Sequence, residues 1–136
     1  MNLYKSMVIS AAGMRAQSVR MRVISENLAN ADSTASTPGG DPYRRKTVSF
    51  KNEMDRALGV DLVEVNKIGR DDSKFGRKYE PGHPAADAMG YVSTPNVNSL
   101  VEIMDMRQAE RSYQANVTSV EAAKNMLMRT IDLLRI

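Results

Sequence analysis

The residue best suited to chemistry in this chain is a single histidine, His83, which lies within the proline-rich turn sequence 81–84. An imidazole can act as a general base or a metal ligand, and Ser73, Ser93 and Asp87 supply hydroxyls and a carboxylate nearby. Their spacing matches neither a catalytic triad nor a recognised set of metal ligands. The pattern favours a structural histidine in a rigid turn, and it predicts no enzyme activity, no metal and no cofactor.

Residues 39–47 form a second candidate, in which two glycines precede the basic tripeptide Arg44-Arg45-Lys46. A phosphate-binding loop needs a glycine directly before its lysine, and Arg45 stands there instead. We therefore reject a nucleotide site. The three cations could contact an anionic partner, but Glu53 and Asp55 follow closely, and such mixed charge is typical of a solvated strand.

The overall charge does not suggest a nucleic-acid partner, because 19 basic and 16 acidic residues leave a net charge of only +3. The excess lies in the first 31 residues, where Arg15, Arg20 and Arg22 would allow weak attachment to anionic lipid as one alternative. No apolar run approaches the roughly 18 residues needed to span a membrane, and the first residues do not resemble a cleaved signal peptide. We expect no direct membrane insertion. The absence of cysteine leaves the redox compartment open.

Proline and glycine divide the chain into three parts. All five prolines and seven of the eight glycines fall between residues 38 and 95, and both residue types disfavour helix interiors. We predict a mainly α fold in which long N- and C-terminal helices pair as a coiled-coil-like stalk around a small β-rich middle domain. The predicted boundaries are 1–34, 35–96 and 97–136.

Apolar residues recur every seven positions in both end segments, which is the spacing of a helix-packing seam. The C-terminal seam is the more regular, and Ser99 with Glu102 predicts a capping box at its start. Asn116 interrupts it as a buried amide that can set helix register. The seams predict an assembly interface that includes Met7, Met14, Met21, Ile24, Leu28, Asn30, Met106, Tyr113, Asn116, Val117, Val120, Leu127, Ile131 and Leu134.

The two helices would be about 45 and 55 Å long, at 1.5 Å per residue, which does not suit a compact globule of this size. Either the seams close on each other in an ordinary helical hairpin, or other subunits share them. Between the helices, the stretches 47–50 and 60–65 alternate as β-strands do, whereas residues 69–90 have the composition of a loop.

Several stretches resemble the axial proteins of the bacterial flagellum. The N-terminal stretches 10–17 and 26–31 resemble the signature that rod and hook subunits share. The stretches 42–46, 79–87, 90–98 and 102–124 are similar to the proximal rod proteins of the flagellar basal body in particular. Asp41, inserted before Pro42, departs from the family pattern and puts only the local loop shape in question.

This resemblance implies a subunit that passes through the flagellar export channel without a cleaved signal and polymerises in the periplasm into a rod that transmits torque. Its partners would be copies of itself, other rod subunits, and membrane-ring and export-apparatus proteins. The alternative is a helical adaptor or export chaperone whose seams close on one partner.

Overall fold

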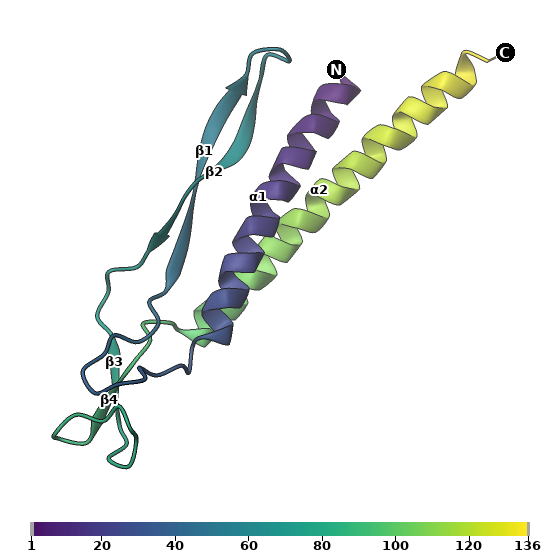
Figure 1. The fold of residues 1–136 in the computed structure, drawn as a ribbon. Helices are drawn as coiled ribbons and strands as arrows, with labels where there is room; N and C mark the ends of the chain where they lie inside the picture. The colour runs from purple at the N-terminus through teal and green to yellow at the C-terminus, as the bar shows by residue number, and fades with distance from the viewer. Residues whose placement is uncertain (1, 136) are drawn as a thin grey trace. The chain divides into compact units, whose positions relative to one another are not determined.

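A computed structural model describes residues 2–135 and contains two long helices at the ends of the chain, with four strands between them (Figure 1). In chain order the elements are α1 (Leu3–Ala29), β1 (Lys46–Asp55), β2 (Val60–Arg70), β3 (Gly76–Tyr79), β4 (Tyr91–Thr94) and α2 (Ser99–Leu133). The predicted fold class, two long terminal helices around a small β-rich middle, is confirmed. No helix among the described residues is long and apolar enough to cross a membrane.

An asparagine caps the N-terminus of each helix. The Oδ1 of Asn2 accepts hydrogen bonds from the amides of Tyr4 and Lys5 at 3.1 and 3.3 Å. The Oδ1 of Asn98 accepts from the amides at positions 100 and 101 at 3.0 and 3.3 Å. A helix start at Ser99 was predicted correctly, but the capping box was not, because Asn98 is the cap and the Glu102 carboxylate is buried elsewhere.

The chain divides into two compact units, each of which includes part of both helices. The first unit comprises the residues up to 21, 49–67 and those from 107 on, and the second comprises 22–48 and 68–106. These units cut across the three segments predicted from composition, and that three-part division stays a prediction.

Strands β1 and β2 form a two-stranded hairpin, and its part in the first unit, residues 49–67, faces α1 through residues 62–65 of β2. Its turn is held by Asp55, whose Oδ1 accepts from the amides of Ala57 and Leu58 at 2.9 and 3.2 Å. Gly59 closes the turn at φ +61°, a conformation that side chains disfavour. The strands contain both predicted alternations and extend beyond them.

In the second unit, β3 and β4 pair antiparallel, with Lys78 opposite Val92 and Tyr79 opposite Tyr91. Val92 is buried together with two alanines, 35 and 85, in a very small core. The loop predicted over residues 69–90 therefore contains a strand, β3. It was missed because all four of its residues are exposed, so it has no alternation of apolar and polar positions.

Candidate assembly interface

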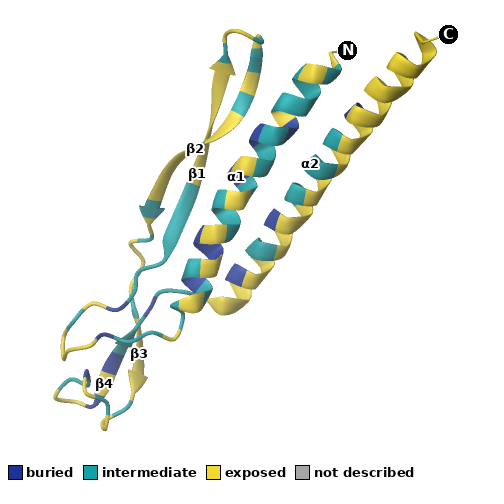
Figure 2. Cartoon of the chain, turned by 45° about the vertical axis from the view of Figure 1, so that its right-hand side comes forward, coloured by how far each residue is buried: buried dark blue, intermediate teal, exposed yellow. Residues whose placement is uncertain are grey.

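The two helices run antiparallel within each unit. In the first unit Gly13 lies against Asn116, and the guanidinium of Arg20 donates to Gln108 at 3.2 Å. In the second unit Asn27 of α1 bonds to Glu102 of α2. Residue numbers therefore rise along α1 as they fall along α2. Toward the free ends of the chain the helices diverge (Figures 1 and 2), and Ala123 is the last buried residue of α2.

The structure separates the predicted interface residues into two groups. One group is buried or half-buried within the subunit, and it consists of Met7, Met14, Met21, Ile24, Leu28, Asn30, Met106, Tyr113, Asn116, Val117 and Val120. The other group is exposed because α2 has left α1 by that point, and it consists of Leu127, Ile131 and Leu134. The second group is thus free to contact another molecule.

The buried residues of the first unit, among those that the structure describes, are all small. Ser10, Ala12 and Ala16 are buried on α1, and Ala109 and Ala123 are buried on α2 (Figure 2). Small side chains bury little apolar area, and hydrophobic stabilisation scales with that area. The helix pair of this unit therefore has a thin core.

Gly13 allows the closest of these approaches. A Cβ atom at this position would lie 2.9 Å from Nδ2 of Asn116 and 3.1 Å from its Cγ. The Asn116 amide is itself held by a 3.0 Å hydrogen bond to the carbonyl of Ser112. A side chain at position 13 would have to displace this amide or separate the helices.

We predict that Gly13→Leu lowers the recovery of the subunit in rods several-fold. Overpacking costs about 1–3 kcal/mol, which exceeds the roughly 1 kcal/mol that replacing a helical glycine gains. Ser18→Leu, at an exposed position of the same helix, is the control and should behave like the parent. Quantifying both variants in isolated basal bodies would test this, and equal recovery would show that the close approach at Gly13 is unimportant.

In the second unit, a buried polar cluster joins α1, α2 and the segment before β1. Its centre is Asn27, which is only 1% exposed. The Asn27 Nδ2 donates to the Lys46 carbonyl at 2.9 Å and to Glu102 Oε2 at 3.0 Å. Its Oδ1 accepts from the Tyr43 hydroxyl and the Lys46 amide, both at 2.9 Å. All four hydrogen-bonding positions of this amide are used, so its orientation is fixed.

Glu102 and Arg45 are the charged pair of this cluster. Glu102 is completely buried, and its Oε1 accepts from Arg45 Nε at 2.5 Å. The other guanidinium nitrogens lie 3.6 Å from the carboxylates of Asp71 and Asp105. The backbone amide of Arg45 donates to Asn96 Oδ1 at 2.8 Å. One arginine thus connects α2, the end of β2 and the segment before α2.

The electrostatics of the cluster favour the charged forms of its ion pairs. Desolvation lowers the pKa of Arg45, but the hydrogen bond and charge of Glu102, together with the two aspartates, outweigh it and raise the pKa overall. The hydrogen bond from Lys46 holds the pKa of Glu26 below its ordinary value. Desolvation raises the pKa of Tyr43, which keeps its hydroxyl a donor to Asn27.

Sequence reasoning did not identify this cluster. The local pattern predicted that Glu102 would cap a helix. It predicted that Arg45 would lie on a solvated strand or contact an anionic partner. The signal was nevertheless present, because Asn27, Arg45, Asn96 and Glu102 each belong to one of the stretches that carry the family resemblance. The fold brings these separate stretches together at one place.

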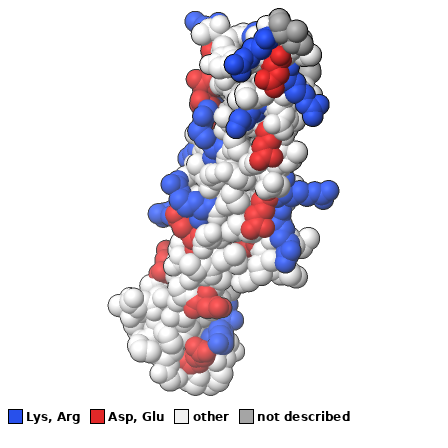
Figure 3. Space-filling model, turned by 90° about the vertical axis from the view of Figure 1, so that its right-hand side faces the viewer, with Lys and Arg blue, Asp and Glu red and all other residues white. Residues whose placement is uncertain are grey.

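The residues that the sequence analysis considered for catalysis or anion binding make contacts that stabilise the fold. His83 is bonded to Thr34 and to the amide of Ala85. Arg44 stacks over Phe75 at 4.3 Å from the ring centroid. Within residues 2–135, no three His, Asp or Glu residues are placed to hold a metal ion. On the face drawn in Figure 3, acidic and basic side chains are interspersed.

The two ends of the chain match families of known proteins. Residues 7–35 match the family described as flagella basal body rod protein, and residues 88–133 match the flagellar basal body rod FlgEFG protein C-terminal family. These ranges lie largely on the two terminal helices. The fold and the matched ends define a rod protein of the flagellar basal body.

Relatives that match nearly the whole chain identify the particular family. The FlgC protein of Agrobacterium fabrum is 51% identical over 127 residues, which cover 93% of this chain and 91% of the relative. FlgC of Bacillus subtilis is 40% identical, with 98% and 99% covered, and FlgC of Salmonella typhimurium is 39% identical, with 92% of each covered. The chain belongs to the FlgC family of flagellar basal-body rod proteins. It is a structural subunit of the basal-body rod and assembles with other basal-body components.

Proposed function

We propose that this subunit polymerises through α1 and α2 into the drive shaft that carries torque outward from the flagellar motor. The observation that carries this proposal is the apolar surface of α2 that the subunit leaves uncovered. Soluble monomers rarely expose large contiguous apolar patches, and such patches mark interaction sites. The exposed large apolar residues of α2 and of the position that follows it are Leu100, Val101, Ile103, Met104, Met126, Leu127, Met128, Ile131, Leu133 and Leu134.

The partners of these surfaces are copies of the same chain and other rod subunits, with membrane-ring and export-apparatus proteins at the end of the rod nearest the motor. We place assembly in the periplasm after passage through the export channel. Met104, Met126 and Met128 are among these exposed residues, and their flexible side chains adapt to neighbours that differ in shape. Such adaptability suits a subunit that meets more than one kind of neighbour.

The role is mechanical and not catalytic. Torque passing along a rod acts to shear the contacts between subunits, and many long helical contacts buried at once resist it together. Within each subunit, the cluster of Asn27, Arg45 and Glu102 ties both helices to the middle segment. A load applied to the helices of the second unit is thereby passed to its strands.

A helical adaptor or export chaperone that binds one partner is the alternative function. It would also leave an apolar helix surface free, but it would form a complex of fixed, small stoichiometry. Counting subunits in isolated basal bodies by quantitative mass spectrometry separates the two. Several copies for each basal body support polymerisation, whereas presence only in soluble one-to-one complexes contradicts it.

We predict that the two units differ in amide exchange before assembly. Helix segments 3–21 and 107–133 have a thin core, and long helices are marginal without tertiary packing. They should exchange fast in a proven monomer, whereas 22–29 and 99–106 should be protected by the polar cluster. Exchange followed by mass spectrometry should show both groups protected in assembled rods. Strong protection of the first group in the monomer would instead favour a closed helical hairpin.

A further inference from the structure

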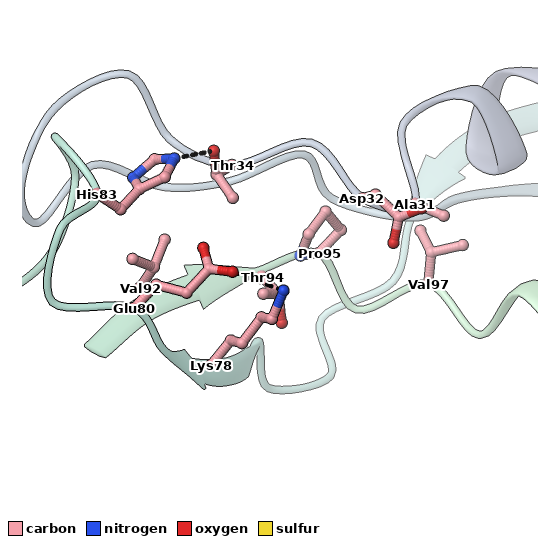
Figure 4. Close-up of a pocket in the computed structure, with 10 residues that line it drawn as sticks. All are labelled: Ala31, Asp32, Thr34, Lys78, Glu80, His83, Val92, Thr94, Pro95 and Val97. Atoms are coloured by element: carbon pink, nitrogen blue, oxygen red, sulfur yellow. Dashed lines mark hydrogen bonds and ion pairs between the residues drawn. The ribbon is translucent and has the colours of Figure 1, made fainter. Parts of the chain in front are cut away.

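His83 makes a hydrogen bond through each nitrogen of its ring. Its Nδ1 accepts from the backbone amide of Ala85 at 3.0 Å, and its Nε2 lies 3.1 Å from the Thr34 hydroxyl (Figure 4). A backbone amide can only donate, so Nδ1 must present its lone pair. The proton of the neutral ring is therefore on Nε2, which donates to the oxygen of Thr34.

This arrangement requires a neutral imidazole. A proton added to the ring would bind Nδ1, where its N–H would oppose the N–H of Ala85. The Ala85 hydrogen bond would be lost, and the ring would have to turn away from its present position. Imidazole is the side chain whose charge ordinarily changes between about pH 5 and 8.

The two bonds connect the segment after α1 to the loop between β3 and β4. Thr34 precedes Ala35, and Ala85 follows His83 by two residues; both alanines are buried against Val92. The loop around His83 is a series of tight turns, in which the His83 amide donates to the Glu80 carbonyl at 3.1 Å and the Ala86 amide donates to the His83 carbonyl at 3.0 Å. The histidine thus holds together the small core of this unit.

A hollow of about 520 Å³ lies beside this contact. The charged groups that line it are Asp32 from the segment after α1, Lys78 from β3 and Glu80 from the loop. Lys78 and Glu80 pair at 2.6 Å, and Figure 4 shows the Glu80 carboxylate on the side of the hollow nearer to His83, with Asp32 at the far end. Asp87, in the same loop, is bonded to the amides of Met89 and Tyr91 and pairs with Arg77.

Glu80 gives a charged imidazolium an alternative partner. The Lys78 hydrogen bond is the main cause that lowers the pKa of Glu80, and the charge of His83 contributes to the same shift. A protonated ring that has lost Ala85 could therefore turn toward Glu80 across the hollow.

We infer that His83 is a pH-sensitive latch, closed by the neutral ring between Ala85 and Thr34 and opened by its protonation. When the latch opens, the segment after α1 and the 80–91 loop separate at their shared core. The latch contributes stability while the ring is neutral, and that contribution is lost once Nδ1 carries a proton.

The test is amide exchange of the full-length chain by NMR, corrected for the intrinsic pH dependence of exchange. One hydrogen bond contributes about 0.5–1.5 kcal/mol, so protection of the Ala85 amide should fall by up to about tenfold between pH 8 and pH 5. The ¹⁵N shifts of the ring should show the Nε2–H tautomer at pH 8. Unchanged protection of Ala85, or an Nδ1–H tautomer at pH 8, would overturn the latch.

His83→Asn is the matched variant, because an asparagine Oδ1 can accept from the amide two residues on and does not titrate. We expect it to keep Ala85 protected equally at both pH values, whereas a loss as large as the parent's would overturn the proposal. Thr34→Val should weaken the contact between the two segments but keep the pH dependence at Ala85. The Glu80 amide, bonded to the Gly90 carbonyl at 2.9 Å, reports whether each variant is folded. If His83→Asn fails that check, the result for the parent chain decides.

Discussion

Leu127→Asp is expected to keep the subunit out of rods while leaving it folded and exported. Leu127 is 45% exposed and lies beyond Ala123, the last buried residue of α2, so the lone subunit should change in stability by no more than about 0.5 kcal/mol. In a rod, the variant would lose roughly 1.5–3 kcal/mol of leucine burial. Burying an unpaired carboxylate would add several kcal/mol more. The loss recurs at every subunit of a polymer.

The measurement is made in cells that lack the natural subunit, by comparing export of each variant with its recovery in isolated basal bodies. Glu121→Lys is the control, because it changes charge at an exposed position of the same helix outside the predicted seam. It should be exported and assembled like the parent. Normal rods built from Leu127→Asp would show that the end of α2 is not an assembly surface.

The second large effect is expected within the subunit, where Glu102→Ala should lower the free energy of unfolding of the second unit by about 3 kcal/mol. Removing one partner of a buried ion pair usually costs about 3–5 kcal/mol. The lower end applies because Arg45 keeps Asp71 and Asp105 nearby and is partly exposed. Asn27 also loses the acceptor of one of its four bonds.

Glu102→Gln should not restore the parent stability. The orientation of Asn27 is fixed by its bonds to Tyr43 and Lys46, so its Nδ2 continues to point at position 102. A glutamine there presents one oxygen and one NH₂ group, and the NH₂ must face either Asn27 Nδ2 or Arg45 Nε, both of which are donors. We expect a loss of about 1–3 kcal/mol, the cost of leaving a buried polar group unsatisfied.

Asp105→Ala is the matched control, since it removes another carboxylate beside Arg45 that is partly exposed and 3.6 Å away. It should cost less than about 1 kcal/mol, as partly exposed pairs do. Urea unfolding followed by circular dichroism gives the three free energies. If Glu102→Ala costs no more than Asp105→Ala, the buried cluster is not what holds the helices of the second unit to its strands.

The terminal helices and the β-rich middle could be predicted from the amino-acid sequence, because the signals for these elements are local. Prolines and glycines act on the hydrogen bonds of their own neighbourhood, and their restriction to the middle of the chain leaves both ends helical. The alternations at 47–50 and 60–65 likewise predicted the two strands of the hairpin. The short strand β3 was missed because an exposed strand leaves no such local pattern.

Which residues of the two helices contact each other depends on how the elements pack. The seven-residue spacing runs unchanged from Met106 in α2 to Leu134, the residue after the helix. Its first half is nevertheless covered and its last part is exposed, because the two helices diverge. The burial of Glu102 was equally hidden: from its neighbours alone it satisfies the pattern of a capping residue, and Asn98 takes that role instead. The Glu102 carboxylate is held by the guanidinium of Arg45, 57 positions earlier in the chain, and by the side-chain amide of Asn27, 75 positions earlier. Hydrogen bonds between such distant positions depend on how the elements pack, and no local periodicity encodes that packing.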